Sequence, residues 1–172
     1  MSIKITADGT VGLYQEIIGI ASPSLQINND VPVTIASPLT IAGALTATAA
    51  AVKLRDVQEL TTPLTGATGA TTHNAALAHV FVHSSIAGNF TANFTNVGLT
   101  SGYATNLTLV LQQGGTPRLP TMGTIDGVAV TSFQWQGGIP PVGTASGTDV
   151  VTFSVINSGG SYLVYGQLVS FA

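Results

Sequence analysis

The three histidines, His73, His79 and His83, are the side chains in this chain best suited to bind a metal ion. His79 and His83 lie four residues apart around Val-Phe-Val, a run that favours a strand. On a strand the two rings share a face but are about 13 Å apart, which is too far for one ion. No carboxylate lies nearby in sequence as a further zinc ligand. A solvated or interface strand is the simpler interpretation, although three copies meeting on an axis could form a three-histidine site.

The seven acidic residues are dispersed, so no catalytic pair is visible in the sequence. They are Asp8, Glu16, Asp30, Asp56, Glu59, Asp126 and Asp149. A glycosidase pair drawn from this set stays open, because a fold can bring distant carboxylates together. The chain contains no Gly-x-Ser-x-Gly nucleophile elbow, dinucleotide fingerprint or phosphate-binding loop. We therefore expect a protein that is not an enzyme, with no catalytic residue, no cofactor and no metal site.

Short strands are predicted from residue 78 onward, where apolar and polar residues alternate between turn-forming clusters. The residues expected to share a face are Phe90, Ala92 and Phe94, then Leu107, Leu109 and Leu111, and then Val151, Phe153 and Val155. Asp126-Gly127 favours a tight turn with positive φ at both positions, and the glycines of 157–160 predict a hairpin between the last two strands. Trp135 in an alternating strand is expected to be a core residue. These patterns predict an all-β fold, an antiparallel β-sandwich or jelly roll over residues 51–172.

Residues 1–50 differ and predict an extended, β-rich N-terminal arm. Pro-Val-Thr-Ile-Ala-Ser (32–37) is followed by Pro-Leu-Thr-Ile-Ala-Gly (38–43) and a weaker third copy. Such small repeats bury an apolar face only against neighbours, so we expect the arm to bind a partner or further copies of the chain. The arm residues expected to make this contact are Ile27, Val33, Ile35, Leu39, Ile41 and Leu45. A plain Thr/Ala-rich linker is the alternative, and a short helix is possible around 49–54.

Charge is scarce in these 172 residues: 45% are hydrophobic and only 6% charged, where about 25% is typical. Either a hydroxyl-rich surface keeps a monomer soluble, or most of the surface is buried between copies; we favour burial in an assembly. The net charge of −3 and the isolated basic residues argue against nucleic acid as a partner. No run reaches the ~20 apolar residues of a membrane span, and no signal peptide is evident.

Residues 53–171 resemble a family of β-rich domains in tail-fibre and particle-surface proteins of marine and cyanobacterial tailed bacteriophages. The resemblance lies in ordered segments: Ala-Thr-Asn-Leu-Thr-Leu-Val-Leu (104–111), Phe-Gln-Trp-Gln-Gly-Gly-Ile-Pro-Pro (133–141), Thr-Ala-Ser-Gly-Thr-Asp-Val-Val-Thr-Phe (144–153) and Gly-Gly-Ser-Tyr (159–162). It implies a virion location, commonly as a trimer, and carries no catalytic residues. Phage fibres are usually far longer than this chain, which favours a smaller particle component.

The resemblance and the arm together predict a capsid decoration, or cement, protein that binds across capsomers and stabilises the head. Its expected partners are two further copies of itself and the major capsid protein or other virion proteins. A short tail fibre or spike that binds host-surface carbohydrate or a receptor is the alternative. Its stacking surfaces would come from Trp135, Tyr103, Tyr162 and Tyr165. A depolymerase domain is a third, weaker interpretation.

Overall fold

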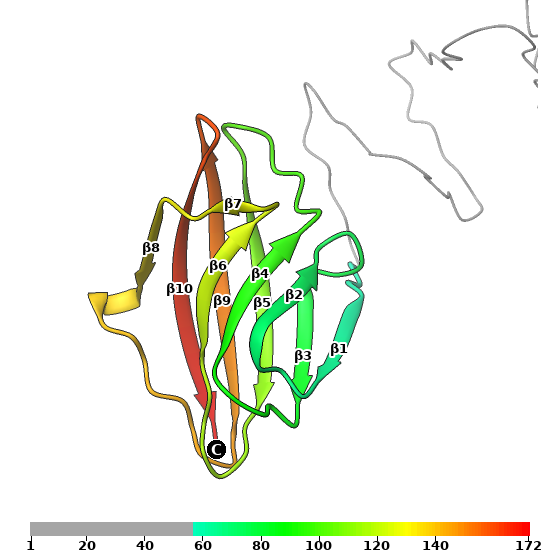
Figure 1. The fold of residues 1–172 in the computed structure, drawn as a ribbon, viewed down its shortest axis with the longest axis vertical. Coiled ribbons are helices and arrows are strands. Elements are labelled where there is room, and N and C mark those ends of the chain that lie inside the picture. Colours follow the sequence, from blue (N-terminus) through cyan, green and yellow to red (C-terminus); the bar gives the residue numbers. More distant parts are fainter. Residues whose placement is uncertain (1–56) are drawn as a thin grey trace, which may run out of the picture. The chain divides into compact units, whose positions relative to one another are not determined.

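The computed structural model describes residues 57–172, which belong to one compact unit spanning 53–172. This part of the chain contains ten strands and a single three-residue 3₁₀ helix, so the predicted all-β class is confirmed for it (Figure 1). No helix within it is long and apolar enough to cross a membrane. The predicted arm, its six partner-binding residues and the possible helix around 49–54 lie outside the described residues.

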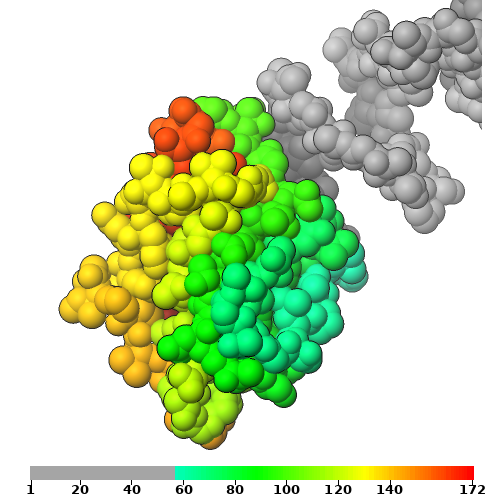
Figure 2. Space-filling view, viewed as in Figure 1, coloured from blue at the N-terminus to red at the C-terminus, as the bar shows by residue number. Residues whose placement is uncertain are grey.

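The strands form two sheets. Sheet A has the order β1 (Thr61–Thr65), β3 (Val80–Ser84), β5 (Ala104–Gln112), β9 (Thr148–Ser158), β10 (Ser161–Phe171) and β8 (Ser132–Trp135). Sheet B has the order β2 (Gly69–Asn74), β4 (Phe90–Thr95), β6 (Pro120–Ile125) and β7 (Val128–Ala129). The 3₁₀ helix η1 (Gln136–Gly138) follows β8. Figure 2 shows the molecule from the side of sheet B, whose green to yellow atoms hide most of β9 and β10.

The first six strands alternate between the two sheets, so the chain winds like the coils of a β-solenoid. Strands β1, β3 and β5 are parallel in sheet A, and β2, β4 and β6 are parallel in sheet B. Antiparallel pairing occurs where β9 joins β5 and β10, and where β7 joins β6. Both sheets are therefore mixed, and the expectation of an antiparallel sandwich or jelly roll is corrected. The physical reason is that each of the strands β1 to β5 is followed by a strand in the opposite sheet, so consecutive strands do not form hairpins and the neighbours within each sheet are parallel.

The two connections predicted as tight turns join antiparallel strands. Asp126 and Gly127 have φ of 50° and 79°, as a type I′ turn between β6 and β7 requires. Gly159 and Gly160, with φ of 63° and 88°, join β9 to β10 in the predicted hairpin. Both turn predictions are confirmed.

The core lies between the sheets and contains the predicted alternating residues. The sets on β4, β5 and β9 that were expected to share a face are all buried. Phe94 and Phe153 meet edge to face across the core, with ring centroids 5.9 Å apart. The exposed edge strand β1 is short and contains Pro63, which removes one backbone donor and makes the edge a poor template for a further strand.

Candidate functional site

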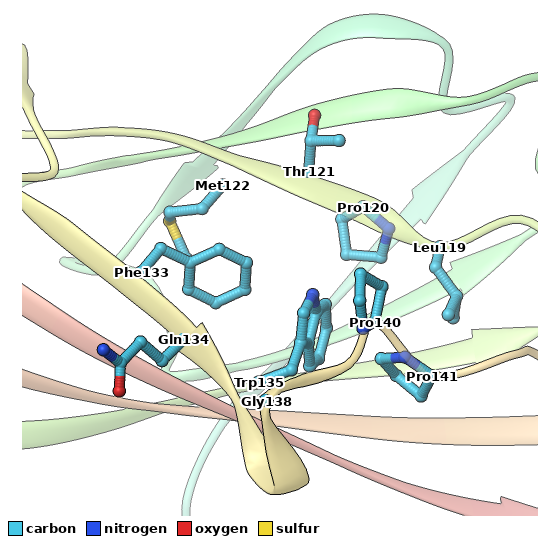
Figure 3. A pocket seen from close by; sticks show the side chains of 10 residues that line it. All are labelled: Leu119, Pro120, Thr121, Met122, Phe133, Gln134, Trp135, Gly138, Pro140 and Pro141. Carbon is cyan, nitrogen blue, oxygen red and sulfur yellow. The ribbon is translucent and has the colours of Figure 1, made fainter.

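A groove lies where the two sheets differ in width. Sheet A has six strands and sheet B four, which leaves the inner side of the outer strand β8 only partly covered. Phe133 and Trp135 of β8 pair with Val164 and Gly166 of β10 and face the same inner side. The hollow beside them measures about 770 Å³. Its lining, shown in Figure 3, is Leu119, Pro120, Thr121, Met122, Phe133, Gln134, Trp135, Gly138, Pro140 and Pro141.

Trp135 belongs to both the core and the groove. Its ring lies 5.0 Å from that of Phe133 in an edge-to-face contact and 6.0 Å from that of Phe153. The indole packs directly on Gly166, where a Cβ atom would come within 2.8 Å of Trp135 Cε3. Glycine at 166 therefore makes room for the indole. The prediction of a core tryptophan holds for this packing, but the other side of the ring lines the groove.

The groove is suited to a neutral ligand with both apolar and hydrogen-bonding groups. None of its lining side chains carries a charge. Trp135 and Phe133 offer ring surfaces, and Gln134 offers an amide at the margin. The Thr121 hydroxyl, by contrast, points away and is already hydrogen-bonded to Thr91 and Phe90. Within residues 57–172 the indole Nε1 of Trp135 forms no hydrogen bond, so that donor is free for a ligand. Binding sites for small molecules commonly combine aromatic walls with a few such polar groups.

A second candidate is a pair of histidines inside the core. His73 of β2 and His83 of β3 are both fully buried, and their Nε2 atoms lie 2.9 Å apart. His73 Nδ1 lies 3.3 Å from the carbonyl oxygen of Asn93, while His83 Nδ1 has no partner in the structure. If His73 Nδ1–H donates to that carbonyl, its Nε2 accepts from His83 Nε2–H, which leaves the His83 Nδ1 lone pair unpaired.

Burial keeps both histidines neutral. Desolvation, the largest cause, and the neighbouring His83 together lower the pKa of His73 to about 4, against a smaller opposing effect of its backbone hydrogen bonds. Desolvation also lowers the pKa of His83 to about 4. A shared zinc ion is not compatible with this geometry, since two Zn–N bonds of about 2.0–2.1 Å in tetrahedral arrangement hold the nitrogens more than 3 Å apart. Among the described residues no three potential metal ligands come together.

The histidines that meet in the structure are His73 and His83, whereas the sequence spacing drew attention to His79 and His83. His79 precedes β3, is half-buried, and lies 3.9 Å from a carboxylate oxygen of Glu59. His83 faces the core instead of solvent, because the alternation within β3 buries Phe81 and His83 together. Its partner His73 lies across the core in the other sheet, a relationship that follows from the winding of the chain. The alternation of apolar residues in β3 could have predicted from sequence that His83 is buried. No local pattern in the sequence indicated that His73 is its partner.

The three tyrosines proposed as stacking surfaces do not gather around Trp135. Tyr162 is buried in the core, and Tyr165 faces outward from β10 in a separate shallow hollow. Tyr103 is exposed beside a third hollow at the loop before β5. Of the four predicted stacking residues, only Trp135 lines the large groove.

The two acids beyond β4 have structural partners. Both carboxylate oxygens of Asp126 accept hydrogen bonds from the backbone of the β4–β5 loop, at Val97 and Gly98. Asp149 is buried and accepts hydrogen bonds from Gln113, Thr144 and Ser170. Each acid thus holds a loop in place.

Comparison with known proteins returns no relative of this chain. No protein-family model matches it, and no curated protein or solved structure matches it. The groove and the histidine pair are accordingly defined by their own geometry.

Proposed function

We propose that this chain is a structural, non-enzymatic protein of a bacteriophage particle, a decoration or cement protein that stabilises the head by binding across capsomers. The observation that carries this proposal is the scarcity of charge on a folded β domain. Residues 57–172 contain four formally charged side chains: Glu59, Arg118, Asp126 and Asp149. Asp149 is buried and Asp126 is bonded to backbone. Such a surface suits a protein that works inside an assembly better than one that is free in solution.

The proposed mechanism combines a β body with an attached arm. The body, residues 51–172, presents a stable two-sheet surface, and the arm contacts the capsid or neighbouring copies through Ile27, Val33, Ile35, Leu39, Ile41 and Leu45. Strand addition would give such an arm affinity through backbone hydrogen bonds without charged side chains. Many copies, each burying an interface above the standard ~1,600 Å², would then resist internal pressure through multivalency. The resemblance of the segments within 104–162, in their order, to phage particle proteins is the reason for proposing a virion location.

The test is deletion of residues 1–50. We expect the remaining domain to fold, because the compact unit lies within 53–172 and its core is complete there, but no longer to sediment with phage heads. Circular dichroism would verify the β fold, and cosedimentation would measure binding. Full binding by the shortened chain would overturn the assignment of the arm.

The Trp135 groove favours a second candidate function, a short tail fibre or spike that binds host-surface carbohydrate. The apolar face of a sugar ring can stack on an indole, and the hydroxyls of the sugar can bond to the free Nε1–H and to Gln134. Because no charge lines the groove, the sugar would be a neutral one.

Trp135 provides a direct measurement for this candidate, since it is the only tryptophan of the chain. Titration with neutral oligosaccharides should change its fluorescence, and Gln134→Ala should weaken that response several-fold. Tyr103→Ala, at a separate hollow, is the matched control and should leave it unchanged. A response lost in Tyr103→Ala but kept in Gln134→Ala would place sugar binding elsewhere.

A further inference from the structure

The outward face of sheet A carries an apolar row that crosses five of its six strands. The register pairs Pro63 with Val82, Val82 with Val110, Val110 with Val150, and Val150 with Val169. We call these five residues the valine row. The residues on either side of it along β5, Leu109 and Leu111, are buried in the core. Because successive side chains of a strand point to opposite faces, the row points away from the core.

The surroundings of the valine row extend the apolar surface. Phe171 and Val169 at the end of β10 are 55% and 45% exposed, and Tyr165 is 45% exposed on the same side of the strand. Ile156 of β9 and Leu163 of β10 are directly paired on this face as well. The other outward positions are mostly threonine, serine, asparagine and glutamine. Thr152 and Gln167 separate the Ile156–Leu163 pair from the row, so the contiguous apolar surface is the row with Phe171 beside Val169. A contiguous apolar surface on a folded domain marks an interaction site.

Charge is absent from this face, which favours a second copy of the chain as its partner. Glu59 precedes β1, Arg118 lies in the β5–β6 connection, Asp126 is in the β6–β7 turn, and Asp149 points inward. No strand of sheet A therefore presents a charged side chain outward. Where two copies meet face to face about a two-fold axis, the same patch lies on both subunits, so a charged patch would face like charge. A neutral face removes that repulsion, whereas recognition of a different protein commonly uses complementary charges.

We propose that the outward face of sheet A, centred on the valine row, is the surface through which copies of this chain associate. The row runs in the direction in which strands stack, and its four steps of about 4.8 Å give roughly 19 Å of apolar contact per copy. Facing sheets pack about 10 Å apart through such side chains. Edge-to-edge pairing is a weaker route at β1, because Pro63 interrupts its backbone donors. The inference rests on the proposed function and deepens it, since it supplies a contact between two copies of the decoration protein.

The experiment places a charge at the centre of the row in the full-length chain. Wild type should have a mass in solution of at least two copies of 17.4 kDa, and Val150→Lys should reduce it to the monomer. Thr72→Lys is the matched control, on an exposed position of β2 in sheet B, and should leave the oligomer intact. A monomeric wild type at micromolar concentration, or a Val150→Lys variant that stays folded and oligomeric, would overturn the proposal.

A second variant covers the case in which Val150→Lys does not fold. The chain has no cysteine, so a single cysteine in Val169→Cys should form a disulfide between copies under mild oxidation, and Thr72→Cys should not. Equal crosslinking of the two variants would also overturn the proposal. Head binding is measured on the same samples. A monomeric wild type that still binds heads overturns the self-association face alone, and an oligomer that binds no heads overturns the decoration function alone.

Discussion

His73 Nε2 and His83 Nε2 meet at 2.9 Å inside the core and join β2 of sheet B to β3 of sheet A. Aromatic rings surround the pair: Phe94 lies 4.9 Å and Phe81 5.0 Å from His73, and Phe90 lies 5.2 Å from His83. This environment has no anion to stabilise an imidazolium among the described residues that contact the pair. The contact between the sheets therefore depends on both histidines remaining neutral.

The first prediction is a loss of stability in mild acid. In the unfolded chain a histidine has a pKa of about 6.5, and in the fold the pKa of each is lowered to about 4. The unfolded state thus binds more protons between these values, so stability is fully present above pH 6.5 and falls as the pH drops toward 4. The loss should reach roughly 3 kcal/mol for one histidine. Urea unfolding of residues 53–172 at pH 7.5, 6, 5 and 4.5 measures it.

The second prediction concerns the contribution of the His73–His83 hydrogen bond to stability. His83→Leu matches Leu64 and Leu111, its register partners on β1 and β5, but leaves a buried nitrogen of His73 without a donor. It should destabilise the fold by about 1–3 kcal/mol. Adding His73→Phe removes that unpaired group and should recover most of the loss.

The double variant also provides the control for the acid effect. Its stability should be nearly constant between pH 7 and pH 5, a window in which most carboxylates stay ionised. A double variant as acid-sensitive as wild type would assign the effect to other groups.

The all-β class was predictable from sequence because the 2-residue alternation of β4, β5 and β9 is strong. The parallel winding was not, since a strand alternates in the same way in a solenoid coil and in a hairpin. The lengths of the connections between strands gave a partial indication of which strand pairs are antiparallel. Two-residue turns of the Asp126-Gly127 and Gly159-Gly160 type occur at antiparallel connections, whereas the strands β1 to β6 are joined by longer segments.

The candidate site was predictable only in part. Trp135 was identified from its residue type, but its neighbours Pro120 to Met122 come from β6 of the other sheet, with Leu119 just before that strand, and become neighbours through tertiary packing. The groove itself exists because sheet A is wider than sheet B, a property of the whole topology that no local pattern encodes. Likewise, the valine row joins single residues of five strands, and it becomes visible only once their register is known.

The third prediction concerns the glycine beneath the indole. Gly166→Ala places a Cβ within 2.8–2.9 Å of two Trp135 ring atoms and 3.1 Å from Phe133, so the indole should be displaced toward the groove. We expect a red shift of the tryptophan emission and a destabilisation of about 1–3 kcal/mol. Gly115→Ala is the control, since nothing lies within 4 Å of its added Cβ. An unchanged emission spectrum in Gly166→Ala would contradict the packing described for Trp135.

The last prediction concerns Asp149, the buried carboxylate at the opposite end of β9 from the hairpin. Its Oδ2 accepts from Gln113 Nε2 and from the backbone N–H of Thr144, both at 2.9 Å, and its Oδ1 accepts from Ser170 Oγ at 2.8 Å. Asp149→Asn keeps the shape but replaces the charged acceptor with a neutral amide, whose NH₂ group faces either the Gln113 and Thr144 donors or Ser170 Oγ, which would then have to accept. Because hydrogen bonds to a charged group contribute about 1.5–3 kcal/mol each, the free energy of unfolding should fall by roughly 2–4 kcal/mol. Ser170→Ala, which removes a single donor, should cost less than half of that, and equal losses in the two variants would show that the carboxylate acts mainly through Ser170.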